Sequence, residues 1–240
     1  MKLSSNDIVL FSGDSITDGN RGHKMDCNHI FGHGYQYIAA GELALKYASA
    51  SPKFINKGYS GYSMPQLLES WDRDVLENKP TVVSILAGVN DAHQGYNEGR
   101  TVEETVRSFS DSLKEAIKKT KTALPNTKII VCEPFYFPLD RSDLTYRNTP
   151  HTECEDEFLR PDRFDTDEMC SYRVEAIRQI RNAAKEIAEN QADAFVPLYD
   201  KIKDAISNSK PEYFIWDGTH PTIACHTLMA KEWLKAFEKM

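Results

Sequence analysis

The residues best suited to chemistry lie near the two ends of the 240-residue chain. Ser15 follows an apolar segment and is preceded by Gly13 and Asp14, while Asp217 and His220 stand three residues apart near the C-terminus. A serine hydroxyl is a weak nucleophile and needs a neighbouring base. A carboxylate at this spacing can reach the Nδ1–H of the imidazole, which leaves Nε2 to take a proton from a serine. This pattern predicts acyl-transfer chemistry.

Two further turns carry groups that could stabilise an oxyanion. Gly58 and Gly61 follow an expected strand, and glycine lets the backbone approach a ligand or adopt positive φ. Asn90 follows the most apolar strand, and its side-chain NH₂ can donate to developing negative charge. The backbone N–H of Ser15 would point outward if a helix begins there. Each segment alone also fits a helix cap or a tight turn, so only the combination indicates an acyl-transfer site.

Apolar runs that alternate with amphipathic stretches predict the elements that must position these groups. The expected strands cover residues 7–11, 54–56, 81–87, 128–132 and 194–198, and the clearest helices cover 101–117 and 168–190 and follow Pro221. Thr101 and Glu104 have the spacing of a capping box, and Pro221 suits the first turn of the last helix. Strands that alternate with helices predict a parallel sheet in a three-layer α/β/α sandwich. Ligands bind beyond the carboxyl ends of such strands, where the candidate residues fall.

Composition and charge narrow the function classes. The chain is 40 % hydrophobic and 27 % charged, which is typical of a globular protein. Its net charge of -7 argues against nucleic acid or an anionic membrane surface as a partner. Five widely spaced cysteines without a CxxC motif indicate a reducing compartment. The N-terminus lacks the apolar stretch of a signal peptide and no segment is long enough to span a bilayer, so we expect a cytoplasmic protein.

One segment breaks the alternation of strands and helices. The residues from Phe135 to Asp167 are rich in charge, proline and tyrosine and have no clear periodicity. Such a segment is typical of a lid or a pocket-lining loop, and equally of a merely mobile stretch. We expect residues 1–240 to form a single domain that contains this long loop.

A group of potential metal ligands follows the candidate nucleophile. Its members are His23, Asp26, Cys27, His29 and His33. Their spacing matches no closed zinc set, and a loop lining the pocket is the better interpretation. We therefore expect neither a metal nor a cofactor.

Asp14 and Trp216 adjoin the candidate catalytic residues and are the candidate substrate contacts. Asp14 and Asp91 could also compete as the acid of a triad, but both fit groups that brace their loops. Trp216 could form a wall for an acyl group or belong to the core.

Four blocks of the chain together resemble the SGNH/GDSL hydrolase family. They are FSGDSITDG, NKGYSG, GVND and WDGTHP, in the order of that family. The resemblance implies Ser15 as nucleophile, His220 as base and Asp217 as the partner that orients the base. It also implies an oxyanion hole formed by the N–H groups of Ser15 and Gly61 and the side chain of Asn90. The implied fold is flavodoxin-like, with a five-stranded parallel sheet in the order 2-1-3-4-5.

Within that family the chain looks like bacterial acetylxylan esterases. The matching features are GDSITD, the NKGxSG turn, the run from Trp71 to Val75, and WDxxHP. This resemblance implies a serine esterase that hydrolyses small O-acyl esters, such as O-acetyl groups on xylo-oligosaccharides. The expected partner is then a small-molecule ester or an acetylated oligosaccharide, and a homo-oligomer stays open. The alternatives are a lysophospholipase or thioesterase of the same family, a flavodoxin-like binding module without catalysis, and a glycosidase, for which no carboxylates pair at the strand ends.

Overall fold

Five parallel strands form one sheet in the computed structural model, which describes residues 1–22, 29–138 and 166–240. The strand order is β2-β1-β3-β4-β5, and every neighbouring pair is parallel. The bounds of the strands are β1 Ile8–Gly13, β2 Lys53–Gly58, β3 Val82–Leu86, β4 Lys128–Cys132 and β5 Ala194–Val196. The predicted strand order and the predicted α/β class are therefore confirmed.

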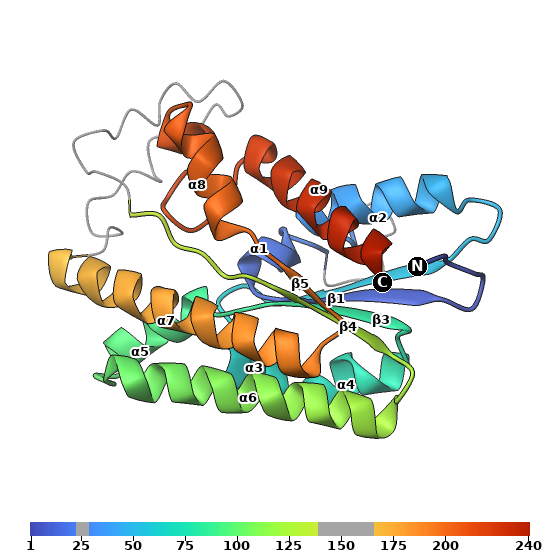
Figure 1. Ribbon diagram of the computed structural model, residues 1–240, viewed down its shortest axis with the longest axis horizontal. Coiled ribbons are helices and arrows are strands. Elements are labelled where there is room, and N and C mark those ends of the chain that lie inside the picture. Colours follow the sequence, from blue (N-terminus) through green and yellow to red (C-terminus); the bar gives the residue numbers. More distant parts are fainter. Residues whose placement is uncertain (23–28, 139–165) are drawn as a thin grey trace.

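Helices cover both faces of this sheet (Figure 1). In chain order they are α1 Ser15–Asp18, α2 Tyr35–Lys46, α3 Met64–Glu69, α4 Trp71–Asp74, η1 Leu76–Asn78, α5 Val89–Asn97, α6 Val102–Ala123, α7 Asp167–Gln191, α8 Tyr199–Ser207, η6 Pro211–Tyr213 and α9 Ile223–Lys239. One layer contains α2, α8 and α9, and the opposite layer contains α3 to α7 (Figure 1). The three layers expected from the sequence are thus present.

Alternation along the strands divides the apolar residues between two cores. In β1, Leu10 packs with the core under α6 and α7, whereas Val9 and Phe11 pack with the core under α2 and α9. Successive side chains of a strand point to opposite faces of the sheet, so strands covered on both sides must be apolar throughout. A polar exception is buried Ser84 in β3, whose Oγ accepts a hydrogen bond from Nε1 of Trp233 at 2.9 Å.

A capping box explains where helix α6 begins. Thr101 and Glu104 form the predicted capping box of α6, with the Thr101 N–H donating to Glu104 Oε2 at 2.8 Å and the Glu104 N–H donating to Thr101 Oγ1 at 3.2 Å. The expectation that Pro221 lies in the first turn of the last helix is wrong. Helix α9 begins at Ile223, because Pro221 pairs with Ile215 in an isolated antiparallel bridge.

The carboxyl ends of three strands lie side by side. Gly13 at the end of β1 is level with Gly58 of β2 on one side and with Leu86 of β3 on the other. Helix α1 follows β1 at once and packs closely on β2, so that a Cβ at Gly58 would lie 2.2 Å from the backbone nitrogen of Asp18. Because the strands are parallel, the segments that follow them meet at this edge of the sheet.

Some predictions fall on residues that the structure does not describe. Most of the predicted 135–167 loop lies outside the described residues. The structure describes only residues 135–138 and 166–167 of this segment. Cys132, Cys170 and Cys225 are free thiols, while Cys27 and Cys154 lie outside the description. No helix in the described part of the chain is long and apolar enough to cross a bilayer. The cytoplasmic location stays a prediction.

Candidate active site

The structure brings a serine, a histidine and an aspartate into one hydrogen-bonded chain. Ser15 is the first residue of α1, immediately beyond β1, and its Oγ lies 2.8 Å from Nε2 of His220. Nδ1 of the same imidazole lies 2.5 Å from Oδ2 of Asp217. The side chains of His220 and Asp217 are 35 % and 28 % exposed, so a small substrate can approach the imidazole. In such an arrangement an imidazole can take the proton of a serine hydroxyl.

The loop before α9 is built around the carboxylate of Asp217. Its Oδ1 accepts hydrogen bonds from the backbone N–H of Thr219 at 2.9 Å and of His220 at 2.6 Å. The Trp216 N–H donates to the carbonyl of His220 at 3.1 Å, next to the bridge that closes the loop. One oxygen of the carboxylate therefore shapes the turn, and the other faces the imidazole.

Electrostatics couple the histidine to this aspartate. Burial acts to lower the pKa of His220, but the hydrogen bond and the negative charge of Asp217 outweigh it and raise that pKa above its ordinary value. Burial acts to raise the pKa of Asp217, but its hydrogen bonds and the charge of His220 lower that pKa below its ordinary value. The carboxylate thus stays ionised and makes the imidazole a stronger base.

Residues far away in the sequence brace the histidine loop from the side of α7. Nη2 of Arg173 donates to Oγ1 of Thr219 at 3.0 Å, and the guanidinium lies 4.1 Å from the centre of the Tyr136 ring. The Phe137 N–H donates to the carbonyl of Gly218 at 2.9 Å. Sequence reasoning missed Arg173. The signal in the sequence is that a charged residue continues the apolar stripe of the helix. In the structure this position faces the core, and Arg173 is 7 % exposed.

The candidate oxyanion donors lie on neighbouring segments. As the first residue of α1, Ser15 has no partner within the helix for its N–H. Gly61 has φ +83°, a conformation that L side chains rarely adopt, and it is exposed. Asn90 lies in the first turn of α5, and its Nδ2 donates to the carbonyl of Tyr62 at 3.1 Å. This bond ties the β2 and β3 loops together beside the end of β1.

Two buried aspartates near this site accept hydrogen bonds from backbone N–H groups and not from Nδ1 of His220. Asp14 is 1 % exposed and caps α1 by accepting from the Ile16 N–H at 3.0 Å, and burial raises its pKa to about 6. Asp91 accepts from the Met64 N–H at 3.0 and 3.2 Å, and burial raises its pKa to about 7. Both therefore act as the loop-bracing groups considered from the sequence, and little of Asp14 is left for a substrate to contact.

The half-buried Trp216 stacks against the imidazole of His220. Its ring centre lies 5.5 Å from that of His220, with 25° between the ring planes. This position is beside the candidate reacting atoms, so a contact with substrate stays a prediction.

Metal binding has no support among the described residues. They contain no group of three or more His, Cys, Asp or Glu side chains that could hold a metal ion. His23, Asp26 and Cys27 lie outside this part of the chain, and the expected absence of a metal stays a prediction.

Comparison with known families supports what this geometry indicates. The sequence model of the GDSL-like lipase/acylhydrolase family matches residues 11–228, a span that contains all five candidate catalytic and oxyanion residues. The chain belongs to this family. It is accordingly a carboxylic ester hydrolase.

Several relatives resemble the chain over almost its whole length. An acetylxylan esterase from Geobacillus stearothermophilus is 27 % identical over 239 residues, which cover 98 % of this chain and 95 % of that protein. A solved structure of an acetylxylan esterase from the same organism has a TM-score of 0.71 at 26 % identity, and the match covers 98 % of this chain and 96 % of the other. A GDSL-like lipase from Parabacteroides merdae has a TM-score of 0.76 at 31 % identity and covers 100 % and 99 %. Solved structures also include catalytic mutants of the Geobacillus esterase in which a serine, an aspartate or a histidine is replaced by alanine.

Proposed function

We propose that this chain is a serine esterase that removes small O-acyl groups, in particular O-acetyl groups from carbohydrates such as xylo-oligosaccharides. The observation that carries the proposal is the 2.8 Å contact between Ser15 Oγ and His220 Nε2, with Asp217 on the other ring nitrogen. An unactivated serine does not attack an ester at a useful rate, whereas a serine bonded to an oriented imidazole does.

The first half of the reaction forms an acyl-enzyme. Ser15 Oγ attacks the ester carbonyl carbon while its proton moves to Nε2 of His220, and Asp217 stabilises the resulting imidazolium. The tetrahedral intermediate then collapses as His220 gives that proton to the departing sugar oxygen. The alcohol leaves, and the acyl group stays on Ser15.

The second half releases the acid. Water attacks the acyl-enzyme while His220 Nε2 takes one of its protons, and the collapse of the second intermediate returns a proton to Ser15 Oγ. The product leaves as the carboxylic acid and gives its proton to solvent, so Ser15 and His220 return to their starting protonation states.

Three donors stabilise the negative oxygen of both intermediates. They are the N–H groups of Ser15 and Gly61 and the side chain of Asn90. The Asn90 amide has two N–H bonds, and the carbonyl of Tyr62 takes one at 3.1 Å. We assign the other to the oxyanion. A fixed donor of this kind acts on charge that develops only in the transition state.

The substrate class rests on the named relatives. The solved Geobacillus esterase is described both as an acetylxylan esterase and as an acetyl-xylooligosaccharide esterase. In the catalytic mutants of the Geobacillus esterase, the replaced aspartate stands three residues before the replaced histidine, as Asp217 stands before His220. The names of the relatives favour an acetylated carbohydrate over the long acyl chain of a lysophospholipid or thioester, and the shared spacing supports Asp217 and His220 as the acid and the base.

A chain-length series tests both levels of this proposal. We expect the wild-type protein to hydrolyse p-nitrophenyl acetate and to lose activity steeply towards the octanoyl ester, while Ser15→Ala is inactive on all of them. Mass spectrometry should then detect loss of acetate from acetylated xylo-oligosaccharides. Faster cleavage of the octanoyl ester would favour the lysophospholipase or thioesterase alternative. Equal activity of wild type and Ser15→Ala would refute the acyl-enzyme.

A further inference from the structure

Gly61 itself makes few packing contacts, although its neighbours Tyr59 and Tyr62 stack on each other and pack against the core. Gly61 is exposed, and a Cβ built there would meet no other atom within 4 Å. An oxyanion donor acts well only when its direction is fixed before the reaction. The direction of the Gly61 N–H is therefore set by the turn that contains it, in which the Tyr62 N–H donates to the carbonyl of Tyr59 at 3.1 Å, and by the hydrogen bonds that hold this turn in place.

One set of bonds holds the loop against the helix that carries the nucleophile. Ser60, whose carbonyl shares a peptide group with the Gly61 N–H, donates from Oγ to Oδ2 of Asp18 at 2.7 Å. Asp18 is 4 % exposed and is the last residue of α1, the single turn that begins with Ser15. The buried carboxylate thus gives the exposed loop a fixed anchor.

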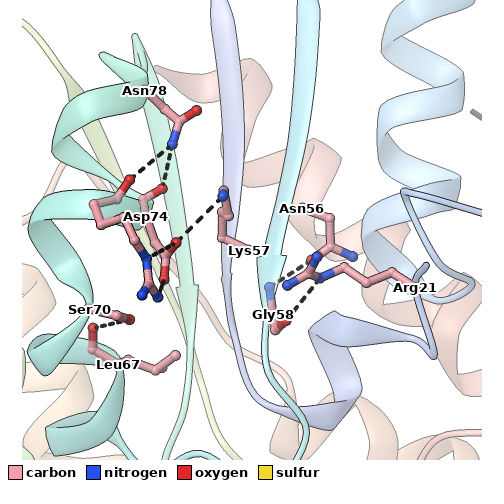
Figure 2. Close-up of polar contacts among 9 residues, drawn as sticks. Arg21, Asn56, Lys57, Gly58, Leu67, Ser70, Asp74 and Asn78 are labelled. Carbon is pink, nitrogen blue, oxygen red and sulfur yellow. Dashed lines mark hydrogen bonds and ion pairs between the residues drawn. The ribbon is translucent and has the colours of Figure 1, made fainter. Parts of the chain in front are cut away.

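The same anchor extends to the end of β2. Nε of Arg21 lies 3.4 Å from Oδ1 of Asp18 and donates to the carbonyl of Gly58 at 3.0 Å. The Gly58 N–H donates to Oδ1 of Asn56 at 2.8 Å. Figure 2 shows the side chains of Asn56 and Arg21 bonded to the N–H and to the carbonyl of Gly58. The strand end from which the loop departs is therefore fixed on both its N–H and its carbonyl.

A second set of bonds holds the other side of the loop. Nε2 of Gln94 donates to the carbonyl of Gly61 at 2.9 Å and to Oε1 of Gln66 at 2.9 Å. Gln94 lies one turn after Asn90 on α5, and Asn90 itself donates to the carbonyl of Tyr62. Both side chains of α5 thus contact consecutive carbonyls of the loop.

We propose that Asp18, acting through Ser60, and Gln94 are positioning residues that fix the N–H of Gly61 towards the oxyanion. This inference rests on the proposed esterase function. Helix α1 carries the nucleophile and Asp18, and helix α5 carries Asn90 and Gln94. Both helices therefore hold the Gly61 loop, which lies between them. The positions of the three oxyanion donors relative to one another are fixed as a result.

Two single variants and a rescue test this role. Ser60→Ala removes the hydrogen bond to Asp18, and Gln94→Ala removes the hydrogen bond to the carbonyl of Gly61. Ser60→Thr keeps the hydroxyl. We expect each alanine variant to lower kcat on p-nitrophenyl acetate by about 10- to 100-fold, with KM within about twofold of wild type. Gln94→Ala should leave Tm unchanged, whereas Ser60→Ala takes one hydrogen bond from the buried carboxylate of Asp18 and should lower Tm modestly. Water can solvate the exposed carbonyl of Gly61 that Gln94→Ala leaves behind, but it cannot hold the loop in place. Ser60→Thr should recover most of the kcat.

A matched control separates positioning from general loss of a hydroxyl. Ser70 lies between α3 and α4, and its Oγ donates to the carbonyl of Leu67 at 3.3 Å (Figure 2). Ser70→Ala should leave kcat unchanged. A phenylboronate, which forms a tetrahedral adduct with an activated serine, should bind Ser60→Ala more weakly by the factor lost in kcat.

The outcomes are distinguishable. Ser60→Ala and Gln94→Ala with wild-type kcat, in a protein whose Ser15→Ala variant is inactive, would overturn the positioning role and leave the esterase function intact. So would a loss of kcat matched by a fall in Tm without weaker boronate binding. Wild-type protein no more active than Ser15→Ala would instead remove the proposed function.

Discussion

Replacing Asp217 with asparagine separates the catalytic contact of this side chain from its structural ones. In the native protein Oδ1 accepts two backbone N–H bonds and Oδ2 faces Nδ1 of His220. Asparagine can keep its single oxygen on the two backbone N–H groups. Its NH₂ then faces Nδ1 and forces the proton of the ring onto Nε2, where it blocks acceptance of the Ser15 proton.

The expected loss follows from this change of tautomer. We expect kcat/KM of Asp217→Asn to fall by about 10⁴, which corresponds to about 5 kcal/mol of transition-state stabilisation. The free energy of unfolding should change little, because the two backbone bonds remain. Asp217→Ala loses them as well, which should cost about 2 kcal/mol and lower Tm by about 4–8 °C.

The assay compares both variants with wild type on p-nitrophenyl acetate and by thermal unfolding. Similar low activities with different Tm values would support separate catalytic and structural roles for the two oxygens. An Asp217→Asn enzyme that retains more than about a tenth of wild-type kcat/KM would refute the reasoning about the tautomer.

Three further predictions concern the donor, the base and the strand end. Asn90→Ala should lower kcat by about 10²–10³, measured on p-nitrophenyl acetate, because one oxyanion donor is lost. Because the raised pKa of His220 means that protonation disables the base at a higher pH, kcat/KM should fall on acidification through a value above 6.5, the ordinary histidine pKa, in a pH–rate profile. Gly58→Ala should lower the unfolding free energy by about 3 kcal/mol in urea denaturation, because its Cβ would meet Asp18 backbone. The control Gly41→Ala adds its Cβ to open space on α2 and should stabilise by about 0.5–1 kcal/mol.

Opposite results would contradict these three statements. Asn90→Ala with wild-type turnover would remove that side chain from the oxyanion hole. An acidic limb at or below 6.5 would mean that burial, rather than the carboxylate, dominates the pKa of His220. Equal stabilities of Gly58→Ala and Gly41→Ala would show that the end of β2 has room for a side chain.

Much of the sheet was predictable because buried strands need apolar residues. The run at Val82–Leu86 is buried throughout and was the clearest expected strand. The strand expected at 54–56 extends over Lys53–Gly58, since pairing with β1 continues through polar residues. The strand expected at 194–198 ends at Val196, because Glu133 takes the N–H groups of Leu198 and Tyr199 instead of the sheet.

The sequence motifs of the candidate site were predictable, whereas the groups that support them were not. Ser15 and His220 lie 205 positions apart, yet each stands in a short block with a recognisable pattern. Arg173, whose partner Thr219 lies 46 positions away, stands in no such pattern, and neither does Gln94. Helical periodicity reports which side of a helix is buried, but only the tertiary fold decides which loop a polar side chain meets. The catalytic roles themselves stay predictions.

The most direct test of the account is covalent labelling with a fluorophosphonate, mapped by peptide mass spectrometry. We predict one adduct per chain, on the peptide that contains Ser15, together with complete loss of esterase activity. Labelling should be absent in Ser15→Ala and greatly slowed in His220→Ala. Unlabelled wild-type protein, or an adduct on another residue with equal rates in all three proteins, would contradict the claim that His220 activates Ser15.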